Sequence, residues 1–224
     1  MDLYHALNRG VEGRDIFLDS SDYVRFVHNL YAFNSSTPAQ DFSRNTNVGH
    51  TMSHIGVTSE RIVDIHGWCL MRNHYHLLLS ERTEGGLSLF LRKLNVGYGR
   101  YFNERYERSG YVFGGKTKKV LIENDAQFNY ILHYIHLNPL DYLKGAEEWR
   151  IRSNGGIKSS KESLAYLKSY RWSSYLDYIG EQNFPSILTT SLFGEPSGGY
   201  EKTITRYLKG ATSDSDTAST LSLE

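Results

Sequence analysis

The amino-acid sequence predicts an α+β fold of the ferredoxin-like or RRM-like type, in which the element order βαββαβ forms an antiparallel sheet. Strand-like and helix-like segments follow one another in that order, and the two central strand segments are joined by only Arg72 and Asn73. A further helical segment ends just before Pro139. We expect the first two helices to cover one face of the sheet and to leave the other face open for a ligand.

Composition places the chain among ordinary globular proteins. It has 224 residues, a formal net charge of zero, 39% hydrophobic residues and 22% charged residues, which suits one domain with elaborations. The single cysteine, Cys69, excludes an internal disulfide framework and a multi-cysteine zinc site, and we expect it to be a buried strand residue. Neither a signal peptide nor a membrane-length apolar run is visible. We therefore expect a cytoplasmic protein.

The first elements are a short strand and a helix. Residues 4–10 resemble a strand that ends at Gly10, and the cluster Ser20–Tyr23 offers an N-cap for a helix over residues 22–33. The apolar residues of this helix recur at helical spacing: Tyr23, Phe26, Val27, Leu30 and Tyr31. Residues 34–60 are rich in Ser, Thr and Asn and lack a clear period, which predicts a long loop insertion.

The middle of the chain supplies the remaining strands. Residues 61–71 and 74–80 predict two strands, and apolar spacing from Gly86 predicts a helix to about Arg108. Residues 111–122 are rich in strand-forming types and predict one or two strands.

A final helix precedes a helical C-terminal extension. Asn124 caps it, and it must end near Asn138 because proline follows. Residues 141–210 form the expected extension, with an insertion over 141–168 and a Trp- and Tyr-rich helical segment over 164–180. Residues 211–224 have the composition of a disordered tail.

One segment concentrates positive charge. Residues 92–119 contain eight basic and two acidic residues, a net charge of +6, with six tyrosines and phenylalanines among them. The basic residues are Arg92, Lys93, Arg100, Arg105, Arg108, Lys116, Lys118 and Lys119. Cations that follow a phosphate backbone, mixed with rings that stack on bases, suit single-stranded nucleic acid. The alternative is a solvated helix face and a basic hairpin whose aromatic residues belong to the core.

Two histidines stand two residues apart on a predicted strand. His74 and His76 project from the same sheet face, whereas Tyr75, Leu77 and Leu79 project from the other face towards the helices. Two imidazoles that converge on the open face can hold a divalent metal ion. The alternative is a pair of surface histidines that only form hydrogen bonds.

A tyrosine and an asparagine on the last predicted helix complete the candidate site. Tyr134 and Asn138 are four residues apart and therefore lie one above the other. A tyrosine hydroxyl is a competent nucleophile when a metal ion polarises its target, and the asparagine carbonyl oxygen can be a third ligand. The alternative is a boundary tyrosine and a helix-terminal asparagine. Tyr130, one turn earlier, is the rival nucleophile.

Three further histidines are candidates for supporting roles. His66 shares strand parity with Asp64 and Trp68, so it is either a supporting residue or, as we favour, a packed histidine. His133 and His136 flank Tyr134 and can assist proton transfer, although exposed histidines are common on helices.

The arrangement of these motifs resembles a known family. Residues 67–79 are similar to the Met-x-Asn-His-x-His core of single-tyrosine transposases of the HUH nuclease superfamily, and residues 134–139 are similar to that family's Tyr-Ile-x-x-Asn-Pro segment. Residues 172–175 (WSSY), 8–10 (NRG) and 16–17 (IF) resemble elements of the branch associated with REP palindromes. The blocks occur in the expected order over about residues 4–180.

The resemblance implies a mechanism. Residues 1–140 would form the HUH transposase domain, with Tyr134 as nucleophile and Mg²⁺ or Mn²⁺ held by His74, His76 and Asn138. The substrate would be single-stranded DNA beside a palindromic, REP-like hairpin, cleaved through a 5′-phosphotyrosine intermediate that conserves the bond energy for rejoining. A bacterial, nucleoid-associated protein is implied, either a monomer or a homodimer.

The sequence departs from the family in two respects, and two other functions remain open. Arg72 stands where the family usually has proline, and the two insertions bear on substrate recognition and oligomeric state. One alternative is a nicking or replication-initiation protein that cuts at a hairpin without mobilising DNA. The other is a catalytically idle module that binds single-stranded nucleic acid on its open sheet.

Overall fold

A computed structural model describes residues 1–36, 60–150, 159–194 and 198–210. Its centre is a four-stranded sheet of β1 (Leu3–Arg9), β2 (Val63–Met71), β3 (His74–Glu81) and β4 (Lys118–Leu121). The strand order is β2-β3-β1-β4 and every neighbouring pair is antiparallel. This order confirms the predicted ferredoxin-like topology, including the tight turn between β2 and β3.

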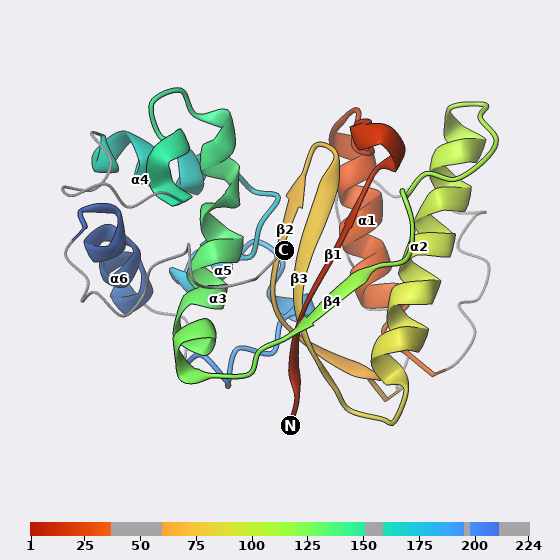
Figure 1. Cartoon of the computed structure of the whole chain (residues 1–224), viewed down its shortest axis with the longest axis horizontal. Coiled ribbons are helices and arrows are strands. Elements are labelled where there is room, and N and C mark those ends of the chain that lie inside the picture. The colour runs from red at the N-terminus through yellow and green to blue at the C-terminus, as the bar shows by residue number, and fades with distance from the viewer. Residues whose placement is uncertain (37–59, 151–158, 195–197, 211–224) are drawn as a thin grey trace.

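Two helices cover one face of the sheet. They are α1 (Ser20–Ala32) and α2 (Gly86–Arg105), on the right of the sheet in Figure 1. Apolar residues of the helices pack on Ala6, Trp68, Leu70, Tyr75 and Leu77 of the strands in one buried cluster. The alternation of strand residues therefore places the predicted apolar set against the predicted helices.

The second face is covered as well, so the expected open face was wrong. Helix α3 (Asp125–Leu137) packs there with α4 (Ser160–Ser169), α5 (Tyr175–Tyr178) and α6 (Gly198–Leu208), on the left in Figure 1. Their side chains join Leu3, Cys69, Met71 and Leu78 of the strands in a second buried cluster. The physical reason is that these strand residues, Cys69 included, are apolar and must be buried.

Most predicted boundaries agree with the structure within a few residues. Asn124 caps α3 by accepting a hydrogen bond from the Gln127 backbone N–H at 2.9 Å, and α3 continues through Asn138 into a 3₁₀ turn, Asn138–Tyr142. The cap of α1 is Asp19 rather than a residue of Ser20–Tyr23, because its carboxylate accepts from the Ser21 and Asp22 N–H groups. Of residues 111–122, only β4 and an isolated bridge between Phe113 and Gly10 are in the sheet.

Parts of the predicted insertions and the tail lie outside the described residues. These parts are residues 37–59, 151–158 and 211–224. The described part of the second insertion holds the 3₁₀ turns Asn138–Tyr142 and Glu147–Arg150, followed by α4. Among the helices that the structure describes, none has the length and apolar character of a membrane span.

A β-bulge in β2 shows that the expected parity of His66 with Trp68 was wrong. The pairing with β3 shifts between Ile65 and Gly67, so the side chains on either side of the bulge no longer alternate regularly. Trp68 packs against α1 and α2, whereas the His66 Nε2 lies 2.8 Å from Ser80 Oγ and its Nδ1 lies 3.0 Å from the Thr189 carbonyl oxygen. His66 is therefore a satisfied structural histidine.

The Trp-Ser-Ser-Tyr segment extends the sheet at the edge of β2. The backbone N–H groups of Ser174 and Leu70 donate to the carbonyl oxygens of Trp68 and Trp172, both at 2.9 Å. The Ser174 hydroxyl also accepts from the Trp68 N–H at 2.9 Å and lies 2.7 Å from His136 Nε2 on α3. This segment therefore ties α3 to the edge of the sheet.

Candidate active site

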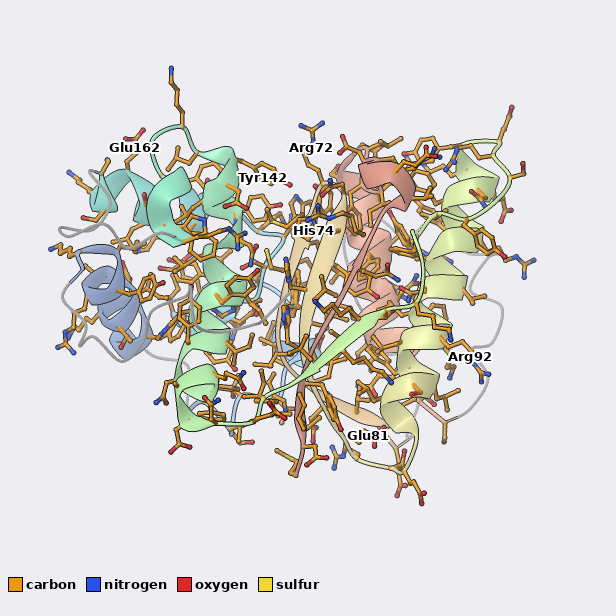
Figure 2. All side chains as sticks on the ribbon, viewed as in Figure 1. Arg72, His74, Glu81, Arg92, Tyr142 and Glu162 are labelled. Carbon is orange, nitrogen blue, oxygen red and sulfur yellow. The ribbon has the colours of Figure 1, made fainter. Side chains whose placement is uncertain are left out.

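The histidine pair lies at one end of the sheet, on the face that α3 covers. His74 begins β3, next to the turn that carries Arg72, and Figure 2 shows both at the end of the molecule where Tyr142 also lies. The register places His76 opposite Leu7 of β1 and Cys69 of β2, so these side chains share a face. His76 is fully buried and His74 is 7% exposed. The two rings meet edge to face with centroids 4.8 Å apart.

Each histidine of the pair is oriented through its Nδ1 atom. The Nδ1 of His74 lies 2.6 Å from Asn73 Oδ1, and because an amide oxygen only accepts, this nitrogen carries the hydrogen. The Nδ1 of His76 lies 2.9 Å from Nε2 of His5, whose ring stacks on it. When His76 Nδ1–H donates to His5, Nε2 of His76 keeps its lone pair, the form in which imidazole binds a metal ion.

The Nε2 of His76 is an unusual buried atom. It has no solvent exposure and no hydrogen-bond partner among the described residues, although buried polar atoms are normally paired. Burial lowers the pKa of His76 far below its ordinary value, and the positive charges that His5, His74 and Arg150 can carry lower it further. The ring is therefore neutral and its unpaired nitrogen is suited to a cation.

Helix α3 brings the tyrosine to the histidines. The Tyr134 ring stands edge to face against His5 and His76, with centroids 5.7 and 5.8 Å away. Residues far apart in the sequence thus form one site, and the tyrosine is 5% exposed. Asn138, one turn later, donates from Nδ2 to the Tyr134 carbonyl oxygen at 2.7 Å and directs its Oδ1 to Arg150.

Arg150 closes the site from the second 3₁₀ turn after α3, Glu147–Arg150. Its Nη1 donates to Tyr134 Oη at 3.0 Å and its Nη2 donates to Asn138 Oδ1 at 2.7 Å. Asp141 accepts from Nη2 at 2.7 Å, and the Trp149 indole N–H donates to Asp141 at 2.6 Å. Burial would lower the pKa of Arg150, but the hydrogen bond with Asp141 and the contacts with Tyr134 raise it overall.

The other candidates on α3 hold structural positions. Tyr130 is 1% exposed and accepts a hydrogen bond from the Tyr207 hydroxyl at 3.0 Å, and burial raises its pKa. His136 is fully buried between Ser174 Oγ and Tyr200 Oη, both 2.7 Å away, and burial lowers its pKa. The His133 ring stacks on the Tyr200 ring of α6.

The residues present suit a divalent metal ion. No three His, Cys, Asp or Glu side chains form a metal-binding group in the part of the chain that is described. The predicted donors are instead the imidazoles of His74 and His76 and the Asn138 amide oxygen, which has two lone pairs, of which Arg150 uses one. The unpaired Nε2 of His76 is the observation that favours a cation.

Arg72 connects the histidine turn to the segment after α3. Its backbone N–H donates to the Tyr142 hydroxyl at 2.7 Å, and its guanidinium pairs with Asp15 at 2.6 Å. A proline at this position would lack the N–H for the first bond. Arg72 therefore makes a backbone contact that a proline could not make.

The eight basic residues of segment 92–119 do not form one surface. Figure 2 shows Arg92 on the outer side of α2, away from His74 and Tyr142. Arg105 pairs with Asp19 and with buried Asp22, at 2.6 and 3.0 Å. Only Lys118, opposite Leu7 in the register, shares the sheet face of His76.

The remaining basic residues divide into engaged and exposed side chains. Lys93 donates to the Ser35 carbonyl oxygen and Lys119 to Ser88 Oγ at 3.1 Å, while the Arg108 guanidinium lies over the Phe102 ring. Arg100 and Lys116 are exposed. The aromatic residues of the segment divide in the same way: Tyr98, Phe102 and Phe113 are buried, and Tyr111 is 88% exposed.

The sequence did not indicate two residues of the site, His5 and Arg150. His5 shares the face of His76 only because β1 pairs with β3, and strand order is not visible in a strand of seven residues. Arg150 ends the second of two 3₁₀ turns, whose path no periodic pattern describes. Both depend on contacts between distant segments.

Fold and site together define a class of protein: an α+β protein with an antiparallel sheet, in which a buried histidine pair lies against a tyrosine of a helix whose C-cap is an asparagine. No protein-family model matches the sequence, and a search of curated proteins finds no match. Among solved structures, the chain is similar to a REP-associated tyrosine transposase bound to a REP hairpin. The TM-score is 0.47 and the sequence identity 10%, with 84% of each chain covered.

Proposed function

We propose that this protein is a metal-dependent strand transferase of single-stranded DNA, with Tyr134 as its nucleophile. The observation that carries the proposal is the contact of the Tyr134 ring with the ring of His76, whose Nε2 is buried and unpaired. A nucleophile and a cation-binding nitrogen are thus adjacent in a site with little exposure. A module that only binds nucleic acid needs neither of them.

The proposed substrate class follows from the sequence blocks and from the exposed cations. The resemblance of residues 67–79 and 134–139 to single-tyrosine transposases, and of residues 172–175 to their REP-associated branch, favours DNA beside a palindromic hairpin. Lys118 on the face of His76, with exposed Lys116 and Tyr111 in the preceding segment, offers cations and a ring for a single strand. DNA binding by the outer side of α2 is a separate proposal, which rests on Arg92 and Arg100.

The chain's own residues determine how the reaction proceeds. His5 orients the His76 ring and Asn73 orients the His74 ring. The hydrogen bond from Asn138 Nδ2 to the Tyr134 carbonyl oxygen orients the Asn138 amide at the end of α3. Tyr134 attacks a phosphodiester in line, which forms a 5′-phosphotyrosine and releases a 3′-hydroxyl; a second 3′-hydroxyl then reverses the step. A Mg²⁺ or Mn²⁺ ion at His74, His76 and Asn138 would supply Lewis-acid polarisation of the phosphate.

A covalent-trapping experiment tests the proposal. The protein is incubated with labelled single-stranded DNA that contains the hairpins flanking its own gene, with Mn²⁺ or Mg²⁺, and analysed on a denaturing gel. We expect a protein–DNA band for the wild type, and no band for Tyr134→Phe or for His76→Ala. Tyr130→Phe is the matched control and should form the band, because Tyr130 is bonded to Tyr207 away from the histidines.

The outcomes separate the alternatives. A band that survives in Tyr134→Phe and disappears in Tyr130→Phe would transfer the nucleophile to Tyr130. Binding of the hairpin without any band, with or without metal, would favour the idle binding module. A band without joining of a second DNA strand would favour a nicking or replication-initiation protein.

A further inference from the structure

Arg150 contacts both Tyr134 and Asn138 at once. Its guanidinium reaches Tyr134 Oη through Nη1 and Asn138 Oδ1 through Nη2, and it lies over the Tyr134 ring with 5.2 Å to the centroid. These two residues are the proposed nucleophile and the proposed third ligand. The sequence blocks that resemble the transposase family do not include this arginine.

The guanidinium is held in place by a second set of contacts. Asp141 accepts from Nη2 at 2.7 Å and lies 3.4 Å from Nε, and the carboxylate is fixed in turn by the Trp149 indole. The Arg150 side chain is nevertheless 31% exposed. A planar, oriented and partly exposed guanidinium is suited to bind phosphate oxygens.

We propose that Arg150 is a further catalytic residue of the strand transfer proposed above, on which this inference rests: it holds the Tyr134 oxygen and the phosphate transferred to it. Asp141 and Trp149 act as positioning residues that orient the guanidinium. The charge that develops on the phosphate in the transition state then lies beside a fixed cation.

The step balances without a further reactant. A bond forms between Tyr134 Oη and phosphorus, the bond from phosphorus to the 3′-oxygen breaks, the phenol proton leaves to solvent, and the 3′-oxygen takes a proton from solvent. In the resealing step the phenol oxygen is the leaving group. Nη1 of Arg150 lies 3.0 Å from that oxygen, so the same N–H can stabilise it as an attacking and as a departing group.

A gate is the opposite interpretation of the same contacts. If Arg150 only occupied Asn138 and Tyr134 until DNA displaced it, its removal would free both groups and accelerate the reaction. The catalytic role predicts the reverse. The sign of the rate change therefore distinguishes the two.

The experiment measures single-turnover formation of the covalent protein–DNA adduct under saturating hairpin DNA, together with hairpin affinity. We expect Arg150→Ala to reduce the rate by a factor of about 10²–10³, the loss typical of one oxyanion-binding donor, with unchanged hairpin affinity. Added ethylguanidinium should restore part of the rate of Arg150→Ala. Arg150→Lys keeps the positive charge but loses the forked pair of N–H donors. Its rate should lie between that of the wild type and that of Arg150→Ala.

Arg82→Ala is the matched control. Arg82 also pairs with an aspartate, Asp64 at 3.3 Å, but it follows the opposite end of β3 from His74. We expect it to retain the wild-type rate and to show no response to ethylguanidinium. A general effect of the additive would appear in this control.

Each outcome has one meaning. Wild-type adduct with an equal or faster rate in Arg150→Ala would overturn the catalytic role and leave the strand transferase standing. A slow Arg150→Ala that ethylguanidinium does not restore, with Arg150→Lys equally slow, would also overturn it, since a purely structural arginine behaves in this way. Absence of adduct in the wild type, with hairpin binding, would overturn the proposed function and this inference together.

Discussion

At the scale of single residues, hydrogen bonds to the Nδ1 atoms set up the site. Asn73 fixes His74 and His5 fixes His76, at 2.6 and 2.9 Å. The His76 ring is neutral, and its Nε2 is buried without a hydrogen-bond partner among the described residues. Binding of a cation to this nitrogen would offset the free-energy cost of burying it without a hydrogen bond.

His5 should therefore determine metal affinity without being a ligand. Replacing His5 by Phe keeps an aromatic ring beside His76 and removes the acceptor for its Nδ1–H, so we expect Mn²⁺ affinity to fall by about 10–100-fold. Calorimetry or electron paramagnetic resonance of Mn²⁺ with the DNA-free protein measures this. His28→Phe, on α1 across the sheet, should bind Mn²⁺ as the wild type does; equal affinity in His5→Phe would contradict the role.

At the scale of elements, the site depends on how α3 is held against the sheet. Gly67 lies where α3 packs on the sheet, and a Cβ there would meet Leu132 Cδ1 at 2.8 Å, so the leucine side chain would have to shift. Ser174 joins the β2 backbone to His136 of α3. The Trp-Ser-Ser-Tyr segment thus has a structural account: it positions the helix that carries Tyr134.

Ser174→Ala should loosen this attachment. The substitution leaves His136 Nε2 and the Trp68 N–H without their partner in a buried position, which costs about 1–3 kcal/mol of the free energy of unfolding. Urea unfolding measures the loss, and covalent trapping should show a slower reaction. Ser169→Ala removes an exposed hydroxyl that bonds within its own helix, and it should change neither; equal stability of both variants would refute the attachment.

The arginines of α2 should differ in role, because some form ion pairs within the fold and others are exposed. Arg105→Ala leaves buried Asp22 without its ion pair and should lower the free energy of unfolding by about 1–3 kcal/mol. Arg100 is exposed, so Arg100→Ala should keep stability and weaken single-stranded DNA binding, most strongly at low salt. Urea unfolding and fluorescence anisotropy measure the two effects. Equal stability of the two variants would show that Arg105 is dispensable for the fold.

At the scale of the whole molecule, two cores on opposite faces of one sheet place neutral histidines in buried positions. Burial lowers the pKa of His66, His76 and His136, and it also lowers the pKa of His28, where Arg25 adds to the effect. The unfolded chain takes up these protons near an ordinary pKa of about 6.5, whereas the folded chain does so only at lower pH. The unfolded state therefore binds more protons below that pH.

Stability of the metal-free protein should accordingly fall on acidification. It should be fully retained above about pH 6.5 and decrease below it, with a slope of about 1.4 kcal/mol per pH unit for each histidine that remains neutral. Urea unfolding in EDTA at a series of pH values measures the slope. His136→Gln should reduce it by one proton, and a flat profile from about pH 7 to about pH 5 would contradict neutral burial.

Local patterns of the sequence determined the elements and half of the site. Strand-like runs predicted β2 and β3, helical spacing predicted α1 to α3, Asn124 was correctly predicted as the cap of α3, and the His-x-His and Tyr-x-x-x-Asn spacings indicated the chemistry. These features depend on residues close in the chain, where the periods of strand and helix fix which side chains share a face. The tertiary structure decided the remaining features: the covered second face of the sheet, the bulge at His66, and the roles of His5 and Arg150 in the site. Each of these depends on which distant segments pack together, because a histidine acquires its partner, and an arginine its target, only when separate elements meet.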